Sequence, residues 1–153
     1  YLNMKKIYKS FGILLLLAIL SSCGTSTAFF DQMSYKETIS AKVEALALMD
    51  KAVNDYSSEQ AKIDEVNLAM QKMYEYEKNR ENNTETVRMW EILLDPEKNL
   101  YGGFIKRWES ESKLSKVFVN EAKPQIEKAF DIILGLETKK VKPEEANSFL
   151  NSN

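Results

Sequence analysis

From residue 34 onward, apolar residues recur every three or four positions, which is the spacing of one face of an α-helix. Two long stripes of this kind lie in the first half of the chain. The first stripe consists of Ile39, Val43, Leu46, Met49, Val53 and Tyr56. The second consists of Ile63, Val66, Met70, Met73 and Tyr74. The two stripes predict two long amphipathic helices, over residues 34–56 and 58–80.

Polar residues 54–58 separate the two stripes, and each stripe follows a pair typical of a capping box, Ser34 with Glu37 and Ser57 with Gln60. The stripes nearly keep their phase across the gap, so one continuous rod over both segments is an alternative. Such a rod would be roughly 70 Å long at 1.5 Å per residue. The two capping pairs favour a helical hairpin.

The second half of the chain predicts shorter segments between clear breaks. Thr84 opens one helix, which Asp95 and Pro96 end. Residues 100–103 are predicted as another break because two glycines follow Tyr101. After this break, a short helix begins with Phe104, Ile105 and Trp108.

A last long helix is predicted from about Ser115 to Leu136, and Pro124 either kinks it or marks its start. Its apolar stripe consists of Val119, Ala122, Ile126, Ala129, Phe130 and Ile133. Residues 141–153 are interpreted as a polar tail in which Pro143 starts at most two helical turns.

The predicted fold class is all-α. No segment alternates apolar and polar residues long enough to indicate a strand. The helices therefore predict an antiparallel helical bundle of about five helices over residues 31–140. A chain of 153 residues has the length of one ordinary domain.

Residues 4–23 follow the three-part plan of a secretory signal. The apolar stretch 11–20 is preceded by the lysines Lys5, Lys6 and Lys9, and small residues then lead to Cys23, the only cysteine. A membrane-spanning helix is an alternative, but it needs about 20 apolar residues, and this stretch supplies roughly half of them. Met4 is interpreted as the initiator and residues 1–3 as an artefact.

The last four residues of this segment, Leu20-Ser21-Ser22-Cys23, resemble a bacterial lipobox. The resemblance covers only Met4–Cys23, and a plain cleaved secretory signal is its alternative. It implies signal cleavage between Ser22 and Cys23, lipid attachment at Cys23 with palmitate or a similar acyl group, and residence on a membrane of the cell envelope. In such lipoproteins, a Gly24 instead of an Asp after the cysteine implies the outer membrane. The absence of an acidic run there implies a domain that faces the periplasm.

These expectations divide the start of the chain into a signal peptide, residues 1–22, and a lipidated tether, residues 23–30. Residues 24–28 are small and polar, so the tether holds the domain within a few nanometres of its membrane. Phe29 and Phe30 follow at once. We expect them to pack beneath the bundle as its first core residues. The alternative is that they lie on the lipid surface.

Charge and composition exclude several classes of function. Without the three signal lysines, 18 basic residues remain against 23 acidic ones, a net charge of about −5, which argues against a nucleic-acid partner. The chain has no histidine, which excludes Ser-His-Asp triads, histidine-containing zinc sites and histidine-ligated haem. It also has no glycine-rich phosphate loop. We therefore expect no cofactor, no metal and no catalytic residue.

Residues 100–108 are the densest aromatic segment after the signal, and they supply the candidate partner contacts Tyr101 and Trp108. Gly102 and Gly103 could present these two side chains as a flexible binding lip. Alternatively, the aromatic side chains close the end of the bundle. We expect Trp108 to be buried there and Tyr101, just before the glycines, to face solvent.

Three functions follow from these features. The first is a non-enzymatic helical binding module, anchored to the membrane through Cys23, that binds a protein partner in the envelope. The second is a binder of a small molecule or a glycan in an aromatic pocket of the bundle. The third and least favoured is a carboxylate-based hydrolase of the cell wall. Glu109-Ser110 resembles the acidic dipeptide of lytic transglycosylases, but the other motifs of that family are missing.

Overall fold

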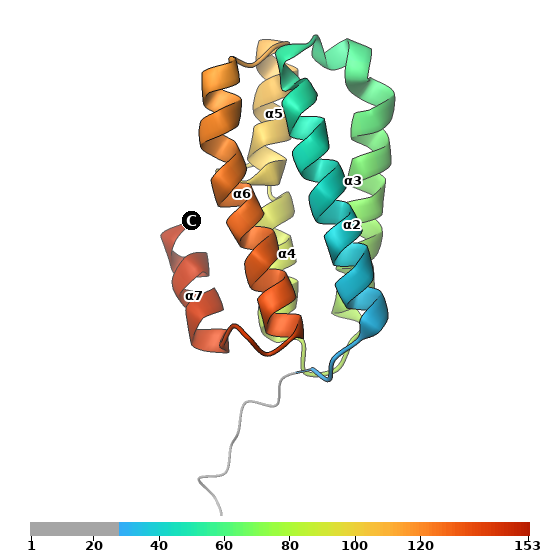
Figure 1. Ribbon diagram of the computed structural model, residues 1–153, viewed down its shortest axis with the longest axis vertical. Coiled ribbons are helices and arrows are strands. Elements are labelled where there is room, and N and C mark those ends of the chain that lie inside the picture. Colours follow the sequence, from blue (N-terminus) through green and yellow to red (C-terminus); the bar gives the residue numbers. More distant parts are fainter. Residues whose placement is uncertain (1–27) are drawn as a thin grey trace, which may run out of the picture.

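The computed structural model describes residues 28–153, so the predicted signal peptide, the cleavage site at Ser22 and the lipidation residue Cys23 lie outside the described residues. Residues 28–153 contain six α-helices, one 3₁₀ helix and no strand (Figure 1). The elements are α2 (Gln32–Met49), η1 (Asp50–Val53), α3 (Tyr56–Lys78), α4 (Thr84–Leu94), α5 (Tyr101–Glu111), α6 (Lys116–Glu137) and α7 (Pro143–Ser152). The predicted all-α bundle is confirmed.

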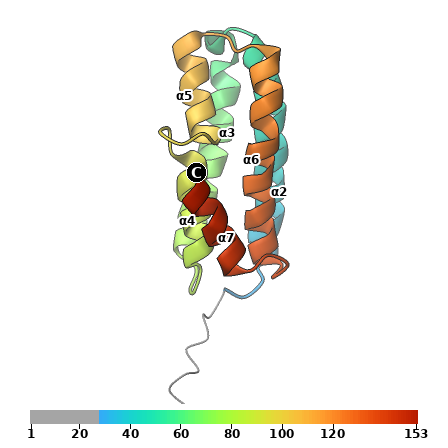
Figure 2. The same ribbon diagram turned by 90° about the vertical axis from the view of Figure 1, so that its left-hand side faces the viewer.

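The helices form an antiparallel bundle in which α2 packs between α3 and α6, and α4 closes the ring by contacting the same two helices. The helix α5 continues beyond the end of α4, so the two short helices together occupy one position of the bundle (Figures 1 and 2). The helix α7 lies outside the ring, against α4 and α6. None of the helices within residues 28–153 combines the length and the apolar character needed to span a bilayer.

The predicted hairpin of α2 and α3 is confirmed, because η1 interrupts the helix and the two helices pack against each other. The predicted capping boxes are wrong. The carboxylate of Asp31 caps α2 by accepting the backbone N–H of Ser34 at 2.9 Å, and α3 begins at Tyr56 after Asp55. Ser34 therefore lies inside the helix, where its buried hydroxyl donates to the carboxylate of Glu77.

The buried face of α2 matches the predicted stripe only in part, since Met49 is buried and Leu46 is partly buried against the core. Ile39 and Val43 are exposed, and the core face consists of Ser34, Thr38, Ala41, Ala45, Leu48 and Met49. This set also has the three-and-four spacing of a helix, but most of its members are small. Because α2 packs against both α3 and α6, small side chains allow its backbone to approach the two neighbours. Size decided which face of α2 is buried.

The stripes of α3 and α6 are buried largely as predicted. Ile63, Val66, Met70 and Met73 belong to the core, as do Val119, Ile126, Ala129, Phe130 and Ile133. The helix α6 begins after Ser115, whose hydroxyl accepts the backbone N–H of Phe118 at 3.1 Å. Pro124 thus lies within α6 and does not mark its start.

Two predictions about the second half are wrong. The helix α5 begins at Tyr101, so Gly102 and Gly103 lie in its first turn and form no break. A Cβ atom at Gly102 would overlap the backbone carbonyl of Leu94, and one at Gly103 would overlap that of Lys98. The glycines therefore permit a close approach between α5 and the chain before it.

The predicted polar tail is also a packed element of the bundle. The helix α7 extends to Ser152, and its buried residues Ala146, Phe149 and Leu150 have the three-and-four spacing of an apolar stripe. These three side chains belong to the same core cluster as those of α4 and α6. The packed bundle thus continues beyond residue 140, where the sequence suggested that it ends.

Candidate functional site

Trp108 is buried, as expected from the sequence. Its ring packs edge-on against the ring of Tyr56, with centroids 5.6 Å apart, and its indole N–H donates to the carbonyl of Asn54 at 3.1 Å. Trp108 therefore joins α5 to the start of α3 and closes the core at that end of the bundle.

Tyr101 is also buried, so the expectation that it faces solvent is wrong. It lies in the first turn of α5 instead of a loop, and its hydroxyl donates to the side-chain oxygen of Asn67 on α3 at 2.8 Å. Burial, and to a smaller extent the nearby Tyr56, raises the pKa of the Tyr101 hydroxyl above its usual value. Tyr101 and Trp108 thus form no exposed binding lip.

The surface beside Tyr101 contains a shallow pocket of ≈ 200 Å³ between α3, α5 and the chain that follows α4. Its lining includes Asn67, Gln71 and Pro96. Pockets that enclose small molecules usually measure about 300–1,000 Å³. The pocket at Tyr101 is smaller than that, so it gives little support to a small-molecule or glycan site.

A larger hollow, the α2–α3 groove, lies along the outer side of these two helices and has a volume of ≈ 500 Å³. Met33, Leu68 and Met73 contribute apolar surface, and Leu68 is 56% exposed. The complete lining is Met33, Glu37, Glu44, Glu65, Leu68, Ala69, Lys72, Met73 and Tyr76. It is an open groove with apolar surface between charged residues.

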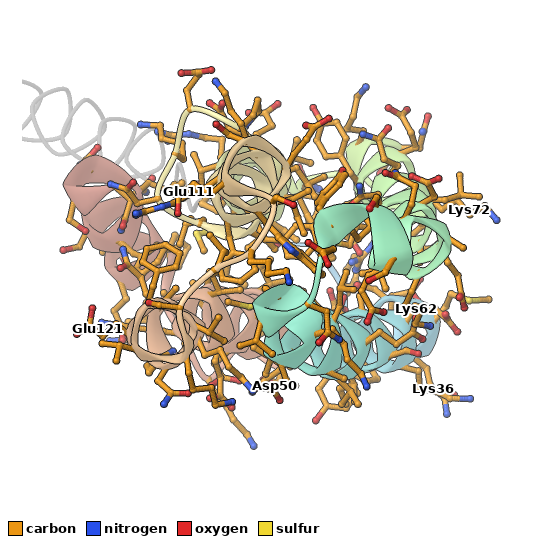
Figure 3. All side chains as sticks on the ribbon, turned by 90° about the horizontal axis from the view of Figure 1, so that it is seen from above. Lys36, Asp50, Lys62, Lys72, Glu111 and Glu121 are labelled. Atoms are coloured by element: carbon orange, nitrogen blue, oxygen red, sulfur yellow. The ribbon has the colours of Figure 1, made fainter. Side chains whose placement is uncertain are left out.

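The α2–α3 groove extends over about three helical turns. Met33 and Glu44 are eleven residues apart on α2, which corresponds to about 16 Å at 1.5 Å per residue. Two of the lining carboxylates share one lysine, because the ammonium of Lys62 lies 3.8 Å from Glu44 and 3.0 Å from Glu65. Lys36, Lys62 and Lys72 lie on this side of the bundle, and Glu111 and Glu121 lie on the other (Figure 3).

A second feature, the basal ion cluster, lies at the end of the bundle where the described chain begins. It consists of Ser34 on α2, Glu77 at the end of α3, Arg80, Asn83 and Glu137 at the end of α6. The guanidinium of Arg80 contacts Glu77 at 2.9 Å and Glu137 at 2.6 Å, and both carboxylates are buried. Arg80 thus joins the end of α3 to the end of α6, and α2 is connected to them through the hydroxyl of Ser34, which donates to Glu77.

The hydrogen bonds of the basal ion cluster are made within the protein, although the cluster holds two carboxylates and one guanidinium. Burial lowers the pKa of Arg80, but the hydrogen bond and charge of Glu137 and the charge of Glu77 outweigh this effect and raise the pKa above its usual value. The Glu77 carboxylate also accepts from Ser34 and Asn83, and that of Glu137 accepts the backbone N–H of Asp31. Every carboxylate oxygen therefore has a donor inside the protein, which indicates a structural role.

The basal ion cluster also fixes the start of the described chain. Arg80 donates to the carbonyl of Phe29 at 2.6 Å, and the hydroxyl of Tyr76 donates to the carboxylate of Asp31 at 2.7 Å. The backbone N–H of Ser34, and then the hydroxyl of Tyr76, hold the pKa of Asp31 below its usual value. Residues 29–31 are therefore bound to the bundle through their backbone and through Asp31.

The side chains of Phe29 and Phe30 do not pack beneath the bundle, so that expectation is wrong. Phe29 is 86% exposed and Phe30 is 55% exposed. The space that they were expected to fill is occupied by the basal ion cluster, which has no apolar surface to offer them. The sequence did not indicate this cluster, since Glu77 and Glu137 lie 60 positions apart in helices that seemed to end in solvated charges.

The acidic residues of α5 lie on its exposed face. Glu109 and Glu111 are exposed on α5, and Glu111 forms an ion pair with Arg107 at 2.7 Å. Within residues 28–153, no three acidic or cysteine side chains are grouped as ligands for a metal ion. Comparison with known proteins gives no match to a family model, to a curated protein or to a solved structure.

Proposed function

We propose that this chain is a lipoprotein of the bacterial cell envelope, and that its helical bundle is a non-enzymatic binding module. Lipid on Cys23 holds it to the outer membrane, and the domain faces the periplasm. The α2–α3 groove receives an amphipathic helix of a protein partner in the envelope. The open groove, with its apolar surface and charged edges, is the observation that carries this proposal.

The anchor is supported by the sequence. Leu20-Ser21-Ser22-Cys23 resembles a lipobox, and it follows a basic start and an apolar stretch too short to span a bilayer. A covalent lipid also accounts for the presence of a single cysteine in a chain that cannot form an internal disulfide. Gly24 supports the outer membrane as the destination.

The shape and chemistry of the α2–α3 groove support a helical partner. A groove of about 16 Å accommodates about three turns of helix, and helices bind such grooves through apolar residues at positions i, i+3, i+4 and i+7. Met33, which is 56% exposed, has a flexible, polarizable side chain that can adapt to different apolar shapes. Glu37 and Lys72 at its edges can pair with charges of either sign on the partner.

The groove is tested by photo-crosslinking in cells, with a photoreactive amino acid in place of Leu68. Val117 provides the matched control, because it is 66% exposed, comparable to Leu68, but does not line the groove. We expect crosslinks to one envelope protein from position 68 and not from position 117. Mass spectrometry of the crosslinked peptide should identify the apolar face of an amphipathic helix. The Leu68→Glu variant should lose the complex because it places a charge against that face.

Other outcomes of this experiment contradict separate parts of the proposal. Equal crosslinking from positions 68 and 117, or a crosslink to a segment without an apolar helical face, would reject the groove as the binding site. The anchor has its own measurement, incorporation of a fatty-acid analogue, which Cys23→Ala should abolish. Unchanged incorporation in that variant would reject the lipobox.

A further inference from the structure

Two large aromatic side chains that are consecutive in sequence, Phe29 and Phe30, are exposed where the described chain meets the bundle. Phe29 and Phe30 have most of their surface in solvent, and they lie just before α2 at the end of the bundle that contains the basal ion cluster. Isolated exposed apolar residues are common on proteins, but adjacent exposed phenylalanines at one end of a molecule are typical of an interaction surface.

The structure holds these residues firmly in their exposed position. The carbonyl of Phe29 accepts from Arg80, and the backbone N–H of Asp31 donates to Glu137. The carboxylate of Asp31 is engaged by Ser34 and Tyr76. With the backbone fixed at residues 29 and 31, the two rings cannot fold back under the bundle without breaking the hydrogen bonds of Phe29 to Arg80 and of Asp31 to Glu137. A set of buried charges thus maintains two exposed apolar rings.

The position of Cys23 indicates what these rings face. Cys23 precedes Phe29 by six residues, which span at most about 20 Å even when fully extended. If Cys23 carries lipid, the end of the bundle with Phe29 and Phe30 must lie at the membrane. Lys139 is also at this end, with its ammonium 5.8 Å from the centre of the Phe29 ring, and Lys140 is exposed beside it. Exposed aromatic residues together with lysines suit the interface of a membrane with anionic lipids.

We propose that Phe29 and Phe30 insert into the interfacial region of the lipid bilayer, with Lys139 and Lys140 at anionic headgroups. This inference rests on the proposed anchor at Cys23 and adds an orientation to it. The acyl chains hold the protein to the membrane, and the two phenylalanines orient the bundle so that its base contacts the bilayer. The helices then stand away from the surface, and the α2–α3 groove opens sideways into the periplasm with Met33 at its membrane end.

The test uses the full-length lipidated protein in vesicles of phosphatidylcholine and phosphatidylglycerol that contain brominated acyl chains. Bromine quenches tryptophan fluorescence only at short range, so it reports insertion and not mere proximity. Phe29→Trp introduces a probe at the surface proposed to enter the membrane, and Val117→Trp introduces a second exposed probe at the start of α6. The native Trp90 and Trp108 are buried and give the same background in both variants. We expect the added fluorescence at position 29 to be largely lost, and that at position 117 to be retained.

Equal quenching at the two positions, or none at position 29, would overturn the proposed insertion of Phe29 and Phe30 into the bilayer. Fatty-acid labelling of the same preparations separates this failure from failure of the anchor. Labelled protein without quenching at position 29 would leave the anchor standing and reject the insertion. Quenching without label would reject the anchor and keep the insertion. Lys139→Glu with Lys140→Glu should reduce the quenching in vesicles with phosphatidylglycerol and leave it unchanged in pure phosphatidylcholine.

Discussion

The two ends of the bundle are held together in different ways. At the base, the basal ion cluster joins α2, α3 and α6 through buried charges centred on Arg80. At the opposite end, buried Trp108 and Leu114 close the core, and backbone hydrogen bonds tie the loops together. There the N–H of Leu114 donates to the carbonyl of Ala52 at 2.8 Å, and that of Tyr56 donates to Ser112 at 2.8 Å.

The two ends differ in how many alternative side-chain arrangements their interactions allow. Apolar packing tolerates many substitutions of similar volume, because the hydrophobic effect has no direction. A buried arginine between two carboxylates is favourable only when its hydrogen bonds are all made. The base is the end at which the described chain begins. The interactions with the stricter geometric requirements therefore lie where the chain enters the bundle. At the opposite end, buried apolar side chains keep water out of the core.

The largest effect is expected from Arg80→Met, which leaves the buried carboxylates of Glu77 and Glu137 without their common counter-ion. Breaking one buried ion pair costs about 3–5 kcal/mol, and this change breaks two. We expect a loss at or above that range, a large part of the roughly 5–15 kcal/mol of an ordinary domain. Urea unfolding, followed by circular dichroism, measures it as a shift of the midpoint at constant slope.

The matched control replaces the charges together. In Arg80→Met combined with Glu77→Gln and Glu137→Gln, no unpaired charge remains, and most of the lost stability should return. The triple variant should still lack the contact between Arg80 and the carbonyl of Phe29. If Arg80→Met alone has the same unfolding midpoint as the wild type, the basal ion cluster does not stabilise the base of the bundle. The proposed difference between the two ends would then be wrong.

The second prediction concerns the apolar end. Trp108→Ala removes a fully buried ring that contacts Tyr56, and truncation of a large buried aromatic residue costs about 3–5 kcal/mol through the cavity that it leaves. Trp108→Phe should cost clearly less, because most of the packing remains and only the indole hydrogen bond to Asn54 is lost. The same urea titration decides between them. Equal losses in the two variants would mean that the hydrogen bond, and not packing, holds this end.

The same distinction, between apolar packing and buried ion-paired contacts, separates the features that the sequence predicts from those that it does not. Periodicity located α3 and α6 and their buried faces, because most of the large apolar residues of both helices recur on one side. For α2 the predicted stripe was right at Met49 and wrong at Ile39 and Val43, which are exposed, while a set of mostly small residues is buried against the two neighbouring helices. Burial of Trp108 was predicted from its size. These features depend on local spacing and on volume.

The features that the sequence did not predict depend on contacts between distant residues. Glu77 and Arg80 have a spacing that suits an exposed ion pair on a helix, and nothing local indicates that Glu137 joins them. The exposure of Phe29 and Phe30 follows from that cluster, so it was missed for the same reason. The glycines beside Tyr101 resemble a hinge in sequence, and only the carbonyls of Leu94 and Lys98 reveal that they permit a close contact.

The smallest expected effect belongs to Tyr101, which combines the two kinds of fastening because it is an apolar ring with one buried hydrogen bond. Tyr101→Phe removes the bond to Asn67 and should cost about 0.5–1.5 kcal/mol at pH 7. The sharper measurement is its pH dependence. Burial raises the pKa of Tyr101 in the folded protein above the value of about 10 in the unfolded chain, so the unfolded chain loses its proton first. The contribution of Tyr101 is therefore complete below about pH 10 and decreases as the pH rises further.

Between pH 9 and pH 11, the wild type should lose on the order of 1 kcal/mol more stability than Tyr101→Phe, which has no hydroxyl to ionise at this position. The comparison between the two proteins cancels the exposed tyrosines, which both retain. Paired urea titrations at the two pH values give the difference directly. A wild type and a variant that weaken equally with pH would mean that the Tyr101 hydroxyl ionises in the folded protein as it does in water. The ring would then be open to solvent, as the sequence first suggested, and the surface beside Asn67 would again be a candidate contact for a partner.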